Sequence, residues 1–256
     1  MIEKLKDFIV VTGHYGCGKT NFAINLAFDY VKAGREVTVV DMDLINPYFR
    51  TSDFREILEE RGVEVITPVF GATNLDIPSL PAAMYGIFEK KNVVIIDVGG
   101  DDAGATVLGR FRPQFEPVDY DMLYVINRFR SMSTDLDEAV EVLGEIEAVS
   151  GLKPTYLVNN SHMMMDTNQA IFDEGLEFAD SISKKTGLPI ICNTVQRELY
   201  DSGMIMTTNN CNPEQCQSCF ATSTGREKSY IETYPVDIYV KTVWQNAKFD
   251  NKVGSV

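Results

Sequence analysis

Short apolar runs of strand length alternate along the chain with longer segments in which apolar residues recur at helical spacing. Most of the short runs contain Val and Ile without polar alternation, which is typical of parallel strands covered by helices on both faces. This pattern predicts an α/β fold with a single doubly wound, mainly parallel sheet. We expect strands at residues 8–12, 37–41, 63–67, 93–98, 122–127, 155–159 and 189–193.

Two helices are predicted most clearly between these strands. One spans 21–33 and ends at Gly34, and the other spans 134–150 and ends at Gly151, because glycine often closes a helix. Thr134 has capping-box spacing to Asp137 at the start of the second helix. The apolar residues expected on its buried face are Leu136, Ala139, Val140, Leu143, Ile146 and Val149.

One stretch of the chain differs in composition and periodicity from the rest. Residues 203–229 are polar and rich in cysteine, and they show no clear period. The length of 256 residues suits one large α/β domain, and we find no linker or repeat that would divide it. We therefore expect one domain over 1–256, with 203–229 as an insertion or small subdomain.

The charge and the absence of long apolar runs exclude several classes of partner. The net charge is −14, and a field of that sign repels the phosphates of nucleic acids and anionic lipid headgroups. No apolar run approaches the roughly 18 residues needed to span a membrane. The N-terminus does not resemble a secretory signal, and the five cysteines suit a reducing compartment. We expect a soluble, cytoplasmic protein without nucleic-acid or membrane partners.

A phosphate-binding motif follows the first predicted strand and opens the first predicted helix. It runs Gly13-His14-Tyr15-Gly16-Cys17-Gly18-Lys19-Thr20 and fits G-x-x-x-x-G-K-T. In such a loop the backbone amides surround the β-phosphate, Lys19 reaches the β- and γ-phosphates, and Thr20 ligates Mg²⁺. The sequence therefore predicts a nucleoside triphosphatase, with Cys17 contributing its amide rather than its sulfur.

Two carboxylates at predicted strand ends complete the expected catalytic set. Asp97 follows four apolar residues in the manner of a Walker B strand, so it is a candidate Mg²⁺ ligand. Gly100, three residues later, has the spacing of a switch glycine whose amide senses the γ-phosphate. Asp43 is expected to orient the attacking water, although a helix-capping role is the alternative, and Asp41 is treated as a strand-end residue.

The order of these motifs resembles that of the SIMIBI-class P-loop ATPases of the CobQ/CobB/MinD/ParA group, which includes the nitrogenase iron protein and metal-insertion ATPases. The resemblance covers about residues 7–195 and rests on the P-loop, on Asp-Met-Asp-Leu at 41–44, on Asp-Val-Gly-Gly at 97–100, and on Asn159-Asn160. It implies that Asn159 or Asn160 recognises adenine. A guanine-binding motif would be Asn-Lys-x-Asp, whereas this chain has Asn-Asn-Ser-His, so ATP is favoured over GTP.

One departure from that group concerns the second residue of the loop. Members that dimerise around ATP usually carry a signature Lys there, whereas this chain has His14. His14 could donate to a partner's phosphate in a homodimer or be a tolerated loop residue. Arg128 and Arg130, just beyond a predicted strand, could supply the missing charge, although a solvated surface role is their default. His162 is expected to have an indirect or plain loop role.

Three cysteines lie within nine residues of the polar stretch. Cys211, Cys216 and Cys219 have C-x₄-C-x₂-C spacing, similar to the first three ligands of a plant-type ferredoxin site. Zn²⁺ or an iron–sulfur cluster would need a fourth ligand, from Cys192, another atom type or a second subunit. Ordinary reduced thiols are the alternative, and Cys192 itself is expected to be buried packing.

A Mg-ATP site and a thiol cluster in one chain favour a slowly hydrolysing, nucleotide-switched ATPase that serves a metallocentre or redox enzyme, whose client the sequence does not name. A small synthetase that activates a carboxylate or carbamate is the first rival. A ParA-like or MinD-like positioning ATPase is the second, disfavoured by the acidic charge and by a C-terminus without a basic amphipathic helix.

Overall fold

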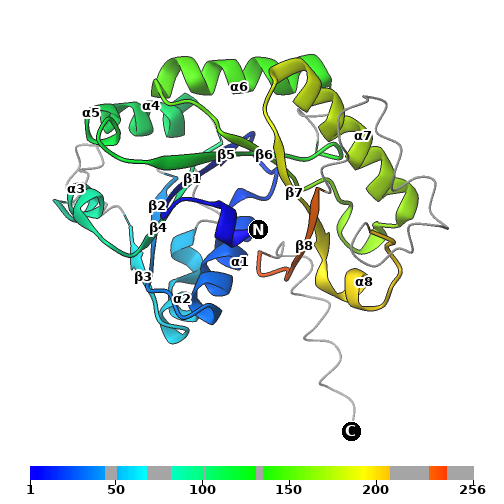
Figure 1. The fold of residues 1–256 in the computed structure, drawn as a ribbon, viewed down its shortest axis with the longest axis horizontal. Helices are drawn as coiled ribbons and strands as arrows, with labels where there is room; N and C mark the ends of the chain where they lie inside the picture. Colours follow the sequence, from blue (N-terminus) through cyan, green and yellow to red (C-terminus); the bar gives the residue numbers. More distant parts are fainter. Residues whose placement is uncertain (44–50, 68–81, 101, 131–134, 208–230, 241–256) are drawn as a thin grey trace, which may run out of the picture.

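The computed structural model describes residues 1–43, 51–67, 82–100, 102–130, 135–207 and 231–240. It contains one eight-stranded sheet in which all neighbouring strands are parallel, in the order β3-β2-β4-β1-β5-β6-β7-β8 (Figure 1). The strands are β1 (Phe8–Gly13), β2 (Val37–Met42), β3 (Val63–Ile66), β4 (Val93–Val98), β5 (Tyr120–Ile126), β6 (Tyr156–Asn159), β7 (Ile190–Gln196) and β8 (Glu232–Val236). The predicted α/β fold with a single parallel sheet is confirmed.

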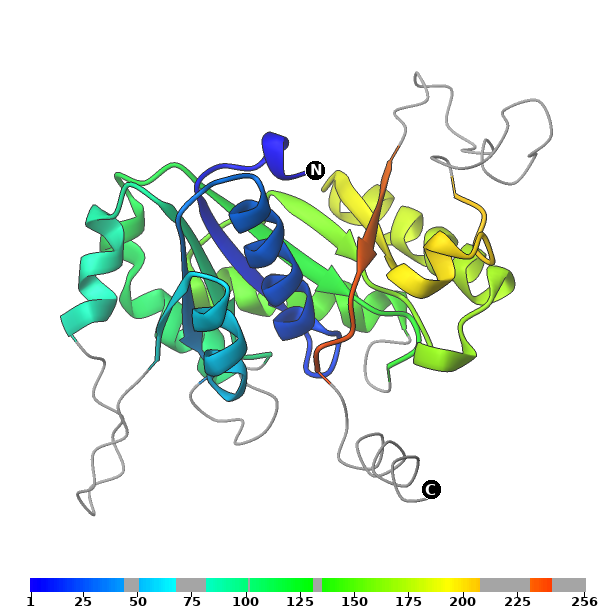
Figure 2. The ribbon, with the colours of Figure 1, turned by 90° about the horizontal axis from the view of Figure 1, so that it is seen from below.

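Helices cover both faces of this sheet (Figures 1 and 2). The α-helices are α1 (Lys19–Lys32), α2 (Arg55–Glu60), α3 (Ala82–Gly86), α4 (Asp102–Arg110), α5 (Arg112–Phe115), α6 (Leu136–Ser150), α7 (Gln169–Thr186) and α8 (Arg197–Asp201). Single turns of 3-10 helix are η1 (Ile2–Lys4), η2 (Thr51–Phe54), η3 (Ile87–Glu89) and η4 (Met164–Asp166). No helix among the described residues is long and apolar enough to cross a membrane.

The core has two halves because successive strand residues point to opposite faces of the sheet. Val10 of β1 packs in the half that contains α4, α5, α6 and α7. Its neighbours Ile9 and Val11 pack in the other half, with α1 and α2. Strands buried on both faces need apolar residues at every position, which explains the unbroken Val and Ile runs.

The eighth strand was not expected from the sequence. β8 pairs in parallel with β7 at the edge of the sheet and contains Pro235. Proline removes a backbone donor, so it is tolerated on an edge strand, but it weakens the strand signal in the sequence. The seven predicted strands are all present, with ends that differ by up to three residues.

The start of α6 and part of its buried face were predicted wrongly. The side chain of Asp135 accepts a hydrogen bond from the Asp137 amide and caps the helix, whereas Thr134 lies outside the described residues. Val149 is 43% exposed, and Ser150 is buried instead. A buried hydroxyl is tolerated there because Ser150 Oγ donates to the Ile146 carbonyl within the same helix.

The order of the strands in the sheet indicates where a ligand would bind. From β1 the chain adds β2 and β3 on one side, with β4 inserted beside β1, and later adds β5 to β8 on the other side. In open parallel sheets, ligands bind beyond the carboxyl ends of the strands where the order reverses. The loop that follows β1 lies at this position.

Candidate functional site

The loop at residues 13–20 adopts a conformation that requires glycine. Gly18 has φ +93°, and a Cβ atom there would lie 2.2 Å from the Nδ2 atom of Asn160. A side chain would therefore be strained and would also displace Asn160. Because α1 begins at Lys19 directly after this glycine, the first free amides of the helix face the loop.

Lys19 is held inside the loop rather than in solvent. Its side chain is only partly accessible, with the residue 7% exposed, and its Nζ atom donates to the His14 carbonyl at 3.1 Å. Gly100 lies directly against it, because a Cβ atom on Gly100 would come within 2.6 Å of both Lys19 Nζ and the Tyr15 amide nitrogen. The strand that carries Asp97 thus brings the predicted switch glycine next to the predicted phosphate-binding cation.

Asp97 is buried at the end of β4 and is bonded to the loop. One carboxylate oxygen, Oδ2, accepts from Thr20 Oγ1 at 2.7 Å and from Thr51 Oγ1 at 2.8 Å. The other oxygen, Oδ1, is buried and has no hydrogen-bond partner among the described residues. Burial, and then the charge of Asp41, raises the pKa of Asp97 to about 7, against the opposing effects of Thr20 and Lys19.

β1 and β4 are neighbours in the sheet, so the loop after one and the carboxylate of the other meet at the same edge. This is the fold of a P-loop nucleoside triphosphatase. The unpaired Oδ1 of Asp97, together with Thr20 Oγ1, offers hard oxygen ligands of the kind that Mg²⁺ prefers. The residues present therefore fit the expected cation.

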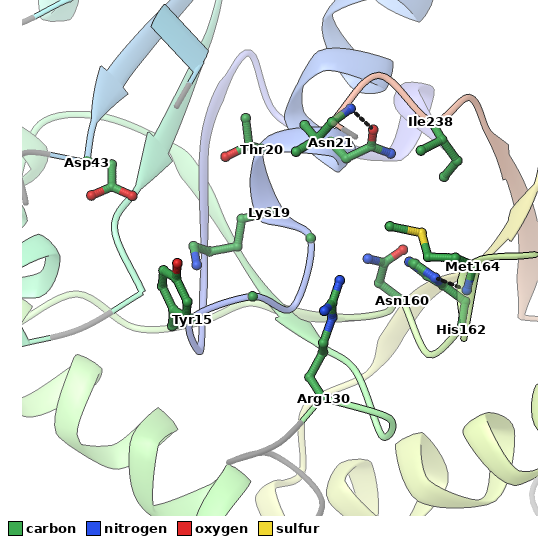
Figure 3. Close-up of a pocket in the computed structure, with 13 residues that line it drawn as sticks. Tyr15, Lys19, Thr20, Asn21, Asp43, Arg130, Asn160, His162, Met164 and Ile238 are labelled. Carbon is green, nitrogen blue, oxygen red and sulfur yellow. Dashed lines mark hydrogen bonds between the residues drawn. The ribbon is translucent and has the colours of Figure 1, made fainter. Parts of the chain in front are cut away.

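Asp43 lies across the cavity from Lys19 and Thr20 (Figure 3). Its backbone amide donates to the buried Asp41 carboxylate at 3.0 Å. A Cβ atom on Gly99 would lie 3.0 Å from Asp43 Oδ1, so the segment that follows β4 runs directly beside this carboxylate. Asp41 at the end of β2 therefore holds the Asp43 backbone, and Asp43 lines the cavity.

A cavity of about 290 Å³ extends from the side chains of Lys19, Thr20 and Asp43, which we call the phosphate end, to a second group of side chains. We call that second group the base end. It comprises residues from α1, from the segment after β6 and from the segment after β8: Asn21, Asn160, His162, Met164, Ile238 and Val240. Figure 3 shows the two ends on opposite sides of the loop.

The two candidate adenine-binding asparagines have different surroundings. Asn160 lines the cavity, and its Nδ2 atom donates to the Cys17 carbonyl at 2.7 Å. Asn159 is buried in β6, where its Nδ2 atom donates to the Gly175 carbonyl and to Asn193 Oδ1. The structure therefore brings Asn160 to the cavity and directs Asn159 into the interior.

Sequence reasoning missed several residues of the base end. His162 was expected to have an indirect or plain loop role, and it lines the cavity beside Met164. Ile238 and Val240 lie just beyond the unpredicted strand β8 and were not considered. Asn21 and Asn25 of α1 hold this C-terminal segment, because both donate to the Asp237 carbonyl.

The two arginines after β5 separate in the structure. Arg130 lines the cavity, whereas Arg128 pairs with Glu174 at 3.3 Å and lies over the Phe178 ring. His14 does not belong to the described cavity lining, and its Nδ1 atom lies 3.2 Å from the Tyr15 carbonyl oxygen. Of Arg128, Arg130 and His14, Arg130 is therefore the one that lines the cavity.

Two cysteines can be placed. Cys17 and Cys192 are both fully buried in the same half of the core, and burial raises the pKa of each thiol. Cys192 is therefore packed as predicted. Cys211, Cys216 and Cys219 lie outside the described residues. Within the described ranges, no group of three or more acidic, His or Cys residues could hold a metal ion by itself.

No protein-family model and no curated protein matches this chain. Similar solved structures include the signal recognition particle receptor FtsY from Elizabethkingia anophelis, with 22% identity, a TM-score of 0.48, and coverage of 73% of this chain and 57% of that one. FtsY from Thermotoga maritima has 22% identity, a TM-score of 0.47, and coverage of 73% and 61%. The signal recognition particle 54 kDa protein from Aeropyrum pernix K1, solved with GDP, has 20% identity, a TM-score of 0.48, and coverage of 73% and 40%. The chain thus spans less than two thirds of each.

Proposed function

We propose that this protein is a Mg²⁺-dependent ATPase that acts as a nucleotide-controlled switch. The observation that supports this most strongly is the 2.7 Å contact between Thr20 Oγ1 and Asp97 Oδ2, which joins the cavity-lining Thr20 to a buried carboxylate 77 positions away. Lys19 lies in the same cavity. A hydroxyl, a carboxylate and a cation in this arrangement suit a metal-bound triphosphate.

The phosphate end would hold the triphosphate by charge and by oriented amides. Lys19 would release the His14 carbonyl and bind the β- and γ-phosphates, while the amides of 13–20 and the start of α1 surround the β-phosphate. Thr20 and Asp97 would hold Mg²⁺. When bound, the cation would neutralise phosphate charge that the protein alone does not compensate.

Asp43 is the group in a position to act on water. Its carboxylate faces the cavity opposite Lys19. We propose that it accepts a hydrogen bond from the attacking water and orients it. Gly100, whose backbone lies against Lys19 Nζ, would offer its amide to the γ-phosphate, so that loss of this phosphate releases the segment after β4.

The base end favours adenine over guanine. Guanine carries N–H donors on its pairing edge, and a carboxylate is the usual acceptor for them. Among the described lining residues, Asp43 is the carboxylate, and it lies at the phosphate end. Asn160 contacts the loop backbone at the Cys17 carbonyl, so its side chain couples the base end to the phosphate loop.

We further propose that the chain is a member of the CobQ/CobB/MinD/ParA group and that it serves a metallocentre or redox enzyme. The group membership rests on the P-loop, on the motifs at 41–44 and 97–100, and on Asn159-Asn160. The metallocentre role rests on the presence of Cys211, Cys216 and Cys219 in the same chain as a nucleotide-binding motif. Anaerobic purification followed by iron, zinc and acid-labile sulfide analysis tests it. Absence of stoichiometric metal, with an unchanged assembly state in the triple Ser variant by light scattering, would remove this assignment.

The switch itself is tested by measuring phosphate release from Mg-ATP with no other substrate. Slow turnover that is lost on Mg²⁺ removal would support the proposal. Strict dependence on an added carboxylate or carbamate would instead identify a synthetase. The Lys19→Ala variant is the control, because it removes the loop cation and should abolish either activity.

A further inference from the structure

The base end contains three polar side chains, and two of them form hydrogen bonds with other parts of the protein through both their oxygen and their nitrogen atoms. Asn21 Oδ1 accepts from the Tyr239 amide at 2.8 Å and the Val240 amide at 3.2 Å, while its Nδ2 atom donates to the Asp237 carbonyl. These bonds hold the C-terminal segment against α1. Turning the Asn21 amide toward a ligand would break them.

Asn160 also forms hydrogen bonds within the protein through both polar atoms of its side chain. Its Nδ2 atom donates to the Cys17 carbonyl at 2.7 Å, and its Oδ1 atom accepts from Thr194 Oγ1 at 2.5 Å. The side chain is almost fully buried. Both polar atoms of Asn160 therefore already bond to the protein and support the loop from the side, which makes the third polar group, His162, the candidate to contact the base.

His162 presents one defined hydrogen-bond donor. The Met164 amide donates to its Nδ1 atom at 3.2 Å, so Nδ1 carries no proton and the neutral ring has its hydrogen on Nε2. Burial, and then the charge of Arg130, lowers the pKa of His162 to about 4, which keeps the ring neutral near pH 7. Within the described part of the chain, Nε2 has no hydrogen-bond partner.

The ring is held by an unusual backbone. Met164 has φ +53°, a conformation that costs a non-glycine residue about 1 kcal/mol or more. Thr167 stabilises it, because its Oγ1 atom accepts from the Met163 amide at 2.9 Å and donates to the Met164 carbonyl at 2.7 Å. Strain that is maintained by such bonds is often found where a side chain must be positioned for function.

We propose that His162 is the residue that selects the base, by donating its Nε2 hydrogen to N1 of adenine. The inference rests on the proposed ATP site and adds the group that recognises the nucleotide. N1 is an unprotonated acceptor in adenine but carries a hydrogen in guanine, whereas N3 and N7 are acceptors in both purines, so a donor at N1 distinguishes the two bases. Met164, Ile238 and Val240 supply apolar surface at the same end of the cavity for the faces of the base (Figure 3).

The first test uses the unmodified full-length protein. Binding of Mg-ATP is compared by calorimetry with binding of three ATP analogues, each with one acceptor nitrogen of adenine replaced by a C–H group. We expect the analogue without N1 to bind about tenfold more weakly, the range for a lost hydrogen bond that leaves a buried donor unpaired. The other two should bind within about threefold of ATP.

Two variants separate the role of the donor from that of the ring. Asn at position 162 can still accept from the Met164 amide in place of Nδ1 but provides no donor at the Nε2 position, whereas Gln places its amide nitrogen near Nε2. His162→Asn should lose about tenfold in ATP affinity and no longer distinguish the sensitive analogue. His162→Gln should retain most of both properties.

Each outcome decides the question. Equal binding of all three analogues and ATP, or equal ATP affinity in His162→Asn and the wild type, would show that His162 does not contact the base. Tighter binding of Mg-GTP than Mg-ATP would overturn the choice of adenine. Failure of the wild type to bind either nucleotide, or a Lys19→Ala variant that binds both normally, would overturn the proposed function itself.

Discussion

The phosphate end and the base end of the cavity are built in different ways. The phosphate end uses a single loop and two strand ends: Lys19 and Thr20 lie in the loop, Asp43 follows β2, and Asp97 at the end of β4 accepts from Thr20. The base end uses α1 and two segments separated by more than 70 residues, and its groups are mostly neutral: His162, Met164 and Ile238 among them. Local sequence encodes the first, and packing of distant segments creates the second.

This difference follows from the chemistry that each end must perform. A triphosphate demands many donors at short range, and consecutive amides with a helix N-terminus provide them without other elements. A base offers a planar apolar surface and a few edge groups, so its site needs side chains from several directions. Substitutions at the phosphate end should therefore have larger effects than those at the base end.

The largest expected effect is at Lys19. Lys19→Ala should lower ATP turnover about a thousandfold and weaken binding, because the β- and γ-phosphates lose their buried cation. Lys32→Ala is the matched control in the same helix, since Lys32 is exposed and forms an ion pair with Asp29 at the helix surface. Steady-state phosphate release checks both. Normal turnover in Lys19→Ala would remove the phosphate end as the active site.

Asp43 should have the next largest effect and should separate hydrolysis from binding. Asp43→Asn is expected to slow turnover about a hundredfold while leaving Mg-ATP affinity within about twofold, because the carboxylate acts on water rather than on phosphate. Single-turnover kinetics and calorimetry on the same preparation measure the two quantities. An equal fall in both would make Asp43 a metal-binding or structural residue.

Substitutions of Arg130 and Arg128 compare a residue that lines the cavity with a neighbour that does not. Arg130→Ala should weaken Mg-ATP binding about tenfold, because Arg130 lines the cavity. Arg128→Ala should change ATP affinity less than about twofold and lower the free energy of unfolding by less than about 1 kcal/mol, since its pair with Glu174 is partly exposed. The reverse order of effects on affinity would mean that the loop after β5 rearranges when nucleotide binds.

The smallest effects concern stability, and the two ends should respond to pH with opposite signs. The pKa of Asp97 rises from 3.8 to about 7 on folding, so the folded state binds a proton that the unfolded state lacks. The resulting stabilisation is present at low pH and lost as pH rises toward 7. The pKa of His162 falls from 6.5 to about 4, so its contribution is present above 6.5 and lost as pH falls toward 4.

Urea unfolding with a chelator present checks these signs. The stability of Asp97→Asn relative to the wild type should increase with rising pH across this range, by at most about 1.4 kcal/mol per pH unit for one proton. The stability of His162→Asn relative to the wild type should decrease with rising pH, within the same limit. Parallel responses in the two variants would contradict the assigned environments.

Seven strands and the phosphate loop could be predicted because their signals are local. Each buried parallel strand is an apolar run, and the loop needs its glycines, Lys19 and Thr20 in consecutive order. Asp97 could be assigned for the same reason, since it ends such a run. The role of Asp43 and the thiol cluster at 211–219 remain predictions from sequence.

Only the tertiary structure shows which residues form the base end, because the local sequence does not determine which distant segments a side chain will contact. Asn159 and Asn160 are adjacent, yet one bonds to α7 and β7 while the other reaches the P-loop. β8 forms only beside β7, and its pairing brings Ile238 to α1. Sequence alone determined where phosphate can bind, whereas the surroundings of the base arise only when segments far apart in the chain pack together.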